Sequence, residues 1–244
     1  VPVGNGPFGL AITPNGATVV TANTNGNSAS FVNSGTNTLL GTIPVGMQPY
    51  GVATSPDGLL AYVANFGSNS VSVIDIATRT VVESIPVGLG PFGIAVKSDG
   101  TRLYVTDNQN RVSIVDAVAR KSIGSIPVGS HPQGVALTPD DKYLFVANQF
   151  SDNVDMIDTA SNTVVFTRAV PSDPVSLGAI ISPPLVRARQ AVEFYHAFFG
   201  HYFVTIQEDE IAALDTGVFV GWARTGQTFN VFDLGSGHAD VCRF

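Results

Sequence analysis

A motif that returns every 41 or 42 residues constrains the fold of this 244-residue chain more than any other feature. Pro-Val-Gly begins at Pro2, Pro44, Pro86 and Pro127, with spacings of 42, 42 and 41 residues. Each copy continues with a glycine seven residues after the proline, a short apolar run and a turn sequence such as Pro-Asp-Gly at 56–58. Proline presets φ and glycine accepts positive φ, so these sequences predict tight turns. The chain is therefore expected to be built from tandem copies of one unit.

Each repeat contains four short segments that are rich in β-branched residues and bounded by turn residues. In the second copy they lie at 51–54, 62–65, 73–75 and 80–85. This pattern is typical of short strands, and no helical periodicity occurs in 1–183. Val71 and Val73 share one face and Ile74 lies on the other, so each sheet needs a neighbour on both sides. Four antiparallel strands in about 40 residues predict an all-β fold of β-propeller blades.

The repeat also sets the expected domain boundaries. Blades are expected at about 2–43, 44–85, 86–126 and 127–170, followed by a single strand at 171–183. A pair of prolines then marks a boundary. We expect a linker at 184–190 and a small α+β domain at 191–244. Its strands are predicted at 191–195, 201–205, 219–224 and 228–232, with a helix at 208–215.

The repeated residues resemble a known family. Tyr-Val-Ala-Asn at 62–65 and its variants, the Pro-Val-Gly-x-x-Pro-x-Gly lead-in and the Ile-Asp ending are similar to the YVTN-type β-propeller repeat over about 1–183. The resemblance implies a bacterial or archaeal protein that is secreted, periplasmic or on the cell surface, with seven blades as the usual number. Four copies fall short of seven, so we expect further blades before Val1, with a four-bladed ring as the alternative. The first blade should then expose an apolar face that includes Val19 or Phe31.

The C-terminal segment resembles a small domain of unknown function at the C-termini of bacterial secreted proteins. The residues that carry this resemblance are 193–195, 201–203, 210–211, 214–215, 221–222 and 224–226. The resemblance implies no known chemistry. Residues 241–244 are similar to the first strand of a following unit, so we expect the domain to be truncated. A redox partner for Cys242 would lie in the missing part.

Composition excludes several classes of protein. The net charge is −7 and no basic stripe occurs, so nucleic acid is not an expected partner. No apolar run is long enough to span a bilayer. A single cysteine excludes a disulfide framework, a Cys-rich zinc site and a Cys-x-x-Cys-His haem attachment. The chain has no Gly-x-Ser-x-Gly elbow, P-loop or dinucleotide fingerprint. We expect no cofactor and no resident metal.

Equivalent residues of the repeats form rings around a propeller axis. The first ring is Asn23, Asn65, Asp107 and Asn148. It is either a polar rim that binds a ligand or cation, or a set of side chains that each close their own turn on backbone N–H groups. Recurrence in every blade favours the structural role. The second ring is Asn33, Asp75, Asp116 and Asp158, and each of these positions fits the start of an Asx-turn.

A third ring, and three histidines, leave further alternatives open. The third ring is Phe8, Tyr50, Phe92 and Gln133. These side chains either wedge between blades or line a recognition surface. His131 departs from the repeat and is therefore a candidate binding residue. His196, His201 and Glu193 could suggest a metal site, but their spacing is not that of a zinc-binding helix, which favours local packing.

The loops between the second and third strands vary most from blade to blade, which favours recognition on a rigid frame. Phe66 and Phe150 are the predicted apolar anchors, with packing onto the blade edge as the alternative. The preferred function is a non-catalytic scaffold on the cell surface or outside the cell that contacts a protein or glycan, with no catalytic residues. The alternatives are a propeller enzyme of the lactonase or cyclase kind and a redox-associated accessory propeller.

Overall fold

The computed structural model describes residues 1–172, 174, 189–196, 201–205 and 222–231. By its internal contacts the chain divides into two compact units, Val1–Ile181 and Ser182–Phe244. Within the described part of the chain, no helix is long and apolar enough to cross a membrane.

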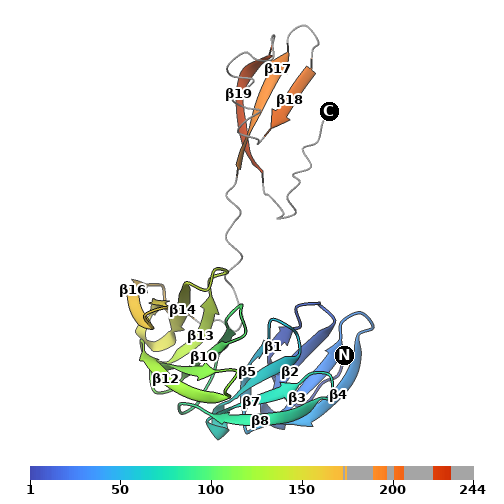
Figure 1. Ribbon diagram of the computed structural model, residues 1–244, viewed down its shortest axis with the longest axis vertical. Helices are drawn as coiled ribbons and strands as arrows, with labels where there is room; N and C mark the ends of the chain where they lie inside the picture. The colour runs from blue at the N-terminus through green and yellow to red at the C-terminus, as the bar shows by residue number, and fades with distance from the viewer. Residues whose placement is uncertain (173, 175–188, 197–200, 206–221, 232–244) are drawn as a thin grey trace. The chain divides into compact units, whose positions relative to one another are not determined.

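The first unit consists of four antiparallel sheets of four strands each, in the order of the chain (Figure 1). Blade 1 contains β1 (Pro7–Ile12), β2 (Thr18–Asn23), β3 (Ser28–Asn33) and β4 (Thr38–Pro44). Blade 2 contains β5 (Pro49–Thr54), β6 (Leu60–Asn65), β7 (Ser70–Asp75) and β8 (Thr80–Pro86). Blade 3 contains β9 (Ile94–Val96), β10 (Arg102–Asp107), β11 (Arg111–Asp116) and β12 (Lys121–Pro127). Blade 4 contains β13 (Pro132–Leu137), β14 (Tyr143–Asn148), β15 (Asn153–Asp158) and β16 (Thr163–Ala169). The predicted fold class of β-propeller blades is confirmed.

The loop after the second strand distinguishes blade 3 from the others. In blades 1, 2 and 4 this loop is a short 3₁₀ helix: η1 (Thr24–Gly26), η2 (Phe66–Ser68) and η3 (Gln149–Ser151). Blade 3 has only residues 108–110 between its second and third strands. One residue fewer in this loop explains why the last repeat spacing is 41 rather than 42.

The core lies between the blades, as the two-faced strands predict. Val71 and Val73 of β7 pack toward blade 3, in a cluster with Leu103 and Val105. Ile74 of the same strand packs in the cluster that contains the core residues of blade 1. Blades 2 and 3 therefore bury both faces of their sheets, and blades 1 and 4 each share one core cluster with a neighbour. A single blade would leave these apolar faces uncovered.

Of the two residues expected on an exposed apolar face of blade 1, Val19 or Phe31, the expectation for Phe31 is wrong. Phe31 is fully buried and packs in one cluster with Ala61 and Val63 of blade 2. Its cross-strand partner is Val20, so both side chains point to the same face of the sheet, the face that blade 2 covers. Val19, on the opposite face, is half-buried.

The glycine at the start of each inner strand lets neighbouring blades approach closely. A Cβ on Gly9 would stand 2.0 Å from the carbonyl oxygen of Tyr50, and one on Gly51 would stand 2.2 Å from that of Phe92. Any side chain at these positions would push the inner strands apart. The glycine recurs in the sequence because the backbone of the next blade occupies the space of its side chain.

The turns between first and second strands have the predicted conformation. Gly16, Gly58 and Gly100 adopt φ of 70°, 72° and 70°, and Asp141 takes the same place in blade 4 with φ 56°. The amide of Gly16 donates to the carbonyl of Thr13 at 2.8 Å, which closes the turn. Blade 4 therefore holds a non-glycine residue in the left-handed region, where Asp is better tolerated than most residues.

The second unit contains a three-stranded antiparallel sheet in the order β18-β17-β19. Its strands are β17 (Arg189–His196), β18 (His201–Thr205) and β19 (Trp222–Val231). The two strands predicted at 219–224 and 228–232 are wrong, because β19 is one continuous strand. β17 begins at Arg189, inside the segment interpreted as a linker. The predicted helix at 208–215 and most of the strand at 171–183 lie outside the described residues.

Candidate functional site

The first ring of polar residues is buried inside the blades. Asn23, Asn65 and Asn148 have no exposed surface, and Asp107 is 1% exposed. The Nδ2 of Asn23 donates to the hydroxyls of Ser28 and Ser30, at 3.0 and 2.9 Å, within its own blade. A ligand cannot reach side chains that are covered in this way. The structure places this ring where it fastens the second strand to the third.

The partners of this ring differ from those expected. The sequence predicts bonds to backbone N–H groups, but Asn65 donates to the hydroxyls of Ser70 and Ser72. Asn148 donates to Asn153 and to the carboxylate of Asp155, which replaces the hydroxyl of the other blades. The reason is register, since the Asn pairs with the residue five positions later in the hairpin.

Asp107 is the exception in the ring, and it accepts a backbone N–H as predicted. Its Oδ1 accepts from the amide of Gln109 at 2.9 Å, and its Oδ2 accepts from the hydroxyl of Ser113 at 3.1 Å. The shorter loop of blade 3 brings that amide within reach. Burial raises the pKa of Asp107 above its ordinary value of 3.8, against the lowering effect of these hydrogen bonds.

The second ring forms Asx-turns, as predicted. Asp158 Oδ1 accepts from the amides of Ala160 and Ser161, at 3.0 and 2.8 Å, and Asn33 makes the same bonds in blade 1. The amide and the hydroxyl of Ser161 hold the pKa of Asp158 below its ordinary value. These residues shape turns and show no sign of a shared site.

The aromatic residues of the third ring gather at one end of the inner strands. Tyr50 stacks on Phe92 with ring centroids 4.7 Å apart, and Phe8 meets both rings edge-on, at 5.0 and 6.0 Å. Phe8 remains 49% exposed. The side chains therefore pack across neighbouring blades, which is one of the two alternatives open from the sequence. A recognition surface at these residues stays a prediction.

Phe66, one of the two predicted anchors, packs onto the blades. Its ring meets Tyr50 edge-on at 5.6 Å and is half-buried. It also lies over Gly90 of blade 3, where a Cβ would stand 2.9 Å from the ring. Phe66 thus belongs to the aromatic cluster rather than to a free loop tip.

Phe150, the second predicted anchor, is 66% exposed and stacks on His131. The two ring centroids are 4.3 Å apart and the planes differ by only 9°. Nδ1 of His131 lies 2.9 Å from Oδ1 of Asn108 in the neighbouring blade. The structure thus brings two predicted site residues together and adds Asn108, which the sequence did not single out because the contact crosses two blades.

The loops that carry these residues share one face of the propeller, which we call the loop face. It consists of the lead-in loops at 1–6, 44–48, 86–91 and 127–131 and the loops at 24–27, 66–69, 108–110 and 149–152. Backbone hydrogen bonds join the two kinds of loop, as from Gln149 to His131 and from Phe150 to Ser130. Asp152 is the only side chain with a formal charge at pH 7 in these segments.

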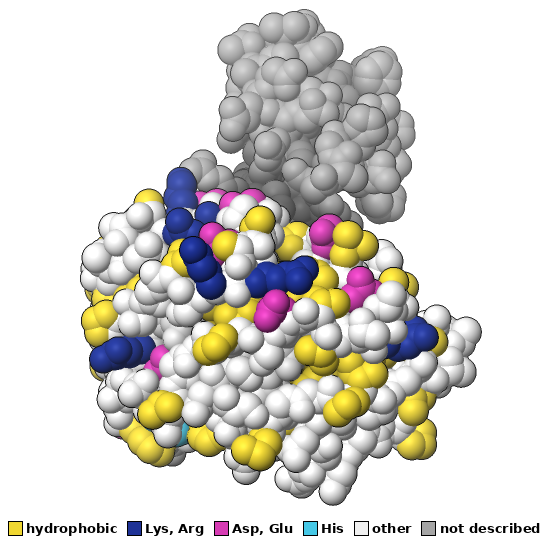
Figure 2. Space-filling model, turned by 60° about the horizontal axis from the view of Figure 1, so that its bottom comes forward, with side chains coloured by type: hydrophobic (Ala, Val, Ile, Leu, Met, Phe, Trp, Pro, Cys, Tyr) yellow, Lys and Arg dark blue, Asp and Glu magenta, His cyan; other side chains and the backbone are white. Residues whose placement is uncertain are grey.

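The opposite end of the strands, which we call the turn face, has a different chemistry. It consists of the turns at 13–17, 34–37, 55–59, 76–79, 97–101, 117–120, 138–142 and 159–162. Eight charged side chains lie in these turns: Asp57, Arg79, Lys97, Asp99, Arg120, Asp140, Asp141 and Lys142. Figure 2 shows Lys, Arg, Asp and Glu side chains over the upper half of the propeller surface that it presents. Charge is therefore segregated to one end of the blades.

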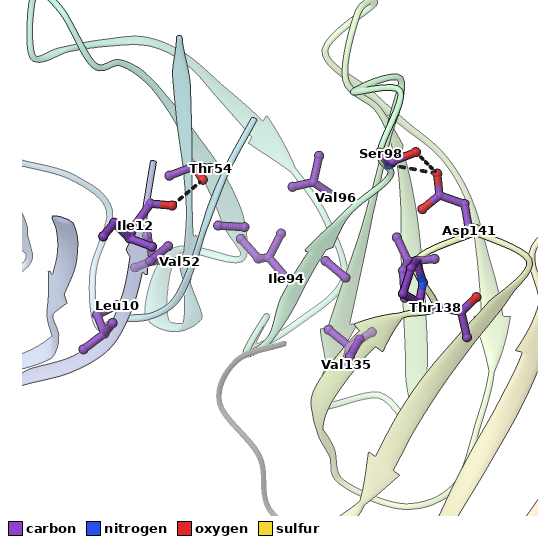
Figure 3. Close-up of a pocket in the computed structure, with 16 residues that line it drawn as sticks. Leu10, Ile12, Val52, Thr54, Ile94, Val96, Ser98, Val135, Thr138 and Asp141 are labelled. Carbon is purple, nitrogen blue, oxygen red and sulfur yellow. Dashed lines mark hydrogen bonds between the residues drawn. The ribbon is translucent and has the colours of Figure 1, made fainter. Parts of the chain in front are cut away.

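A cavity of about 640 Å³ lies between the inner strands of all four blades (Figure 3). Leu10, Val52, Ile94 and Val135 line it with apolar side chains. Near the turn face, Asp141 accepts hydrogen bonds from the amide and the hydroxyl of Ser98, at 2.9 and 2.6 Å. These bonds fasten blade 3 to blade 4. Asp141 is the one titratable side chain among the lining residues, so this lining contains no pair of acid and base.

The described residues contain no group of three or more His, Cys, Asp or Glu side chains that could hold a metal ion. The backbone of His196 pairs with that of His201 in the second unit. The side chains of these histidines, of Glu193 and of Cys242 lie outside what the structure describes, so the sequence predictions for them stay predictions.

Comparisons with known proteins agree with the propeller fold. A family model described as a YNCE-like beta-propeller matches residues 58–137, from β6 to β13. The structure of hydrazine synthase from Kuenenia stuttgartiensis is similar, with a TM-score of 0.65 and 34% identity, over 70% of this chain and 51% of that one. A comparison with curated proteins found no match.

A second solved structure supports the fold alone. It is a functionally unknown protein from Desulfotomaculum acetoxidans DSM 771, with a TM-score of 0.63 and 19% identity, over 75% of this chain and 63% of that one. The chain thus spans about half to somewhat under two thirds of these two structures. The β-propeller assignment is confirmed, whereas the resemblance of the C-terminal segment to a domain of unknown function stays a prediction.

Proposed function

We propose that this protein is a non-catalytic recognition scaffold that is secreted, periplasmic or on the cell surface. The propeller holds the loop face in a fixed shape, and that face contacts a protein or a glycan. The observation that carries this proposal is the segregation of charge, which leaves an aromatic and almost uncharged surface at one end of the blades. Exposed aromatic side chains are enriched at recognition surfaces.

Rigidity of the loops supports the same proposal. Backbone hydrogen bonds fix each loop of the second kind on a lead-in loop, as from Phe66 to Gln48 and from Asn108 to Leu89. Binding to a surface that is already ordered loses little conformational entropy. Met47 and Leu89, at 56% and 53% exposure, extend the apolar surface around the aromatic cluster.

Binding measurements on the two faces test this proposal. The immobilised chain is exposed to panels of envelope glycans and of extracellular proteins, and the wild type is compared with Phe150→Ala and Lys142→Ala. Lys142 is the matched control, because its side chain is 72% exposed on the turn face. We expect Phe150→Ala to lose binding and Lys142→Ala to keep it. Equal binding by both variants, or lactone hydrolysis that His131→Ala abolishes, would overturn the proposal.

The likeness to hydrazine synthase favours a second candidate, an accessory propeller of a redox system. The chain has one cysteine and no Cys-x-x-Cys-His sequence for covalent attachment of a haem, so this candidate places the cofactor on a partner protein. This candidate predicts that the loop face binds a cofactor-carrying protein, and the visible absorption of the captured partner would report it.

A further inference from the structure

The stack of Phe150 on His131 leaves one aromatic face open. The imidazole covers one side of the phenyl ring at a centroid distance of 4.3 Å, and the ring nevertheless stays 66% exposed. The second side of the ring therefore faces solvent. The parallel imidazole of His131 therefore fixes the orientation of the Phe150 ring before any ligand binds.

The imidazole is itself fixed by its neighbours. Oδ1 of Asn108 accepts a hydrogen bond from Nδ1 of His131, so Nε2 is left as a hydrogen-bond acceptor. The backbone amide of His131 donates to Oδ1 of Asn110 at 3.1 Å. Blade 3 thereby fixes the position of a ring in blade 4.

Amide side chains lie next to this pair of rings, with Asn108 and Asn110 hydrogen-bonded to His131. Gln149 precedes Phe150 and hydrogen-bonds to Gln133, while residues 108–110 are all Asn or Gln and all exposed. An amide offers both a donor and an acceptor. A hydroxyl group also donates and accepts, so amides suit a ligand that carries many hydroxyls.

The charge of the loop face limits the class of ligand. Its eight segments contain no Lys or Arg, and the adjacent cation is the exposed Arg111 at the start of β11, so the loops offer no cluster of basic side chains to a phosphate, a sulfate or a nucleic acid. A single acidic side chain, Asp152, is too little to select a polycation. An open, flat ring with a rim of amides fits a ligand that is neutral, has an apolar face and carries hydroxyls at its edge.

We infer that the Phe150–His131 pair is a subsite for a neutral saccharide, whose sugar ring stacks on the open face of Phe150 while its hydroxyls meet the surrounding amides. This inference rests on the proposed recognition role of the loop face and names its ligand class. The sugar's C–H groups are attracted to the negative face of the aromatic ring, as in other aromatic contacts. Nε2 of His131 accepts a hydroxyl at the rim.

Titration with uncharged oligosaccharides tests this inference on the full chain. Hexamers of glucose with α-1,4 or β-1,4 linkages and of N-acetylglucosamine are the probes, and calorimetry and saturation-transfer NMR are the readouts. We expect saturable binding with at least one hexamer, and saturation transfer from the aromatic protons of the protein to one face of the sugar. Binding only to charged glycans would overturn the inference.

Four variants locate the subsite. Phe150→Ala should weaken saccharide binding about tenfold or more, and Phe150→Tyr should keep it within about twofold. His131→Gln should weaken it several-fold with the fold intact, because Gln48 occupies the equivalent position with φ 49° against 54° for His131. Phe166→Ala is the matched control, since Phe166 is 53% exposed on the outer strand β16 and should have no effect. Equal losses in Phe150→Ala and Phe166→Ala contradict the inference.

The outcomes also separate this inference from the proposed function. If no neutral saccharide binds but a protein partner is lost on Phe150→Ala, the saccharide subsite is wrong and the recognition role stands. If neither a saccharide nor a protein depends on Phe150, both are wrong.

Discussion

Gly88 lies directly against the buried carboxylate of Asp107: a Cβ on Gly88 would stand 2.0 Å from Oδ2. The same contact occurs at Gly46, where a Cβ would stand 2.6 Å from Cγ of Asn65. The glycine of each Pro-Val-Gly is therefore required by the polar side chain at the end of the second strand. Two motifs that stand about 20 residues apart in each repeat are parts of one contact.

Gly46→Ala is expected to lower the free energy of unfolding by about 1–3 kcal/mol, because the added methyl group overlaps a fully buried side chain that cannot move. Denaturant unfolding followed by far-UV circular dichroism measures this change. Gly124→Ala is the control, since the nearest atom to its Cβ would be 4.0 Å away and its φ is ordinary. A loss as large in the control as in Gly46→Ala would show that the contact with Asn65 is not the cause.

Asp107→Asn is expected to stabilise the protein at neutral pH by on the order of 1 kcal/mol, since a neutral amide avoids burial of a charge and can keep the bond from Gln109. The raised pKa of Asp107 means that the folded chain binds this proton more tightly than the unfolded chain. The wild type therefore loses stability from this group as the pH rises from 3.8 through the folded pKa. The difference in melting temperature between wild type and variant should widen over that range.

The difference in melting temperature between wild type and Asp107→Asn is measured, rather than the wild-type value alone, because carboxylates with a lowered pKa such as Asp75 and Asp158 stabilise the fold as the pH rises. A variant that melts below the wild type at neutral pH, or a difference that does not change with pH, would show that Asp107 carries no penalty.

The sequence alone predicts the structural features that are local or that recur in every blade. The Pro-Asp-Gly turns and the Asx-turns depend on residues two or three positions apart, so their composition predicts them. The buried ring could also have been found, because Asn23, Ser28 and Ser30 stand at the spacing at which a four-residue loop brings side chains together across a hairpin. The signal is the pair of serines five and seven residues after the Asn.

Contacts between blades and a bulge in the second unit escaped prediction. The pair of Asn108 and His131 depends on how two blades stack, which no spacing in the sequence encodes. The sequence predicts two strands, at 219–224 and 228–232, where the structure has the single strand β19 around Gly226. In the structure, Thr228 pairs with Val192 and Arg224 with Phe194, so a bulge accommodates the glycine within one strand.

Asp75→Asn is expected to reduce the loss of stability in acid. The amide and then the hydroxyl of Thr78 hold the pKa of Asp75 below 3.8. Its stabilising contribution is present above 3.8 and is lost as the pH falls through the lowered folded pKa. Asparagine keeps the turn without titrating, as Asn33 does in blade 1. Melting temperatures from neutral pH to below 3.8 measure the effect, and identical acid profiles for wild type and variant would contradict it.

Phe66→Ala and Phe150→Ala are expected to differ in stability although both residues lie in the loop after the second strand, Phe66 as its first residue and Phe150 as its second. Phe66 is half-buried against Tyr50, so its removal should cost about 1–2 kcal/mol and lower the melting temperature by several degrees. Phe150 is 66% exposed and contacts a single ring, so its removal should shift the melting temperature by less than that of Phe66. Calorimetry of both variants at one pH measures the two shifts. A drop for Phe150→Ala as large as that for Phe66→Ala would show that the stack on His131 holds the blade together, and a loss of binding in that variant could then no longer be read as recognition.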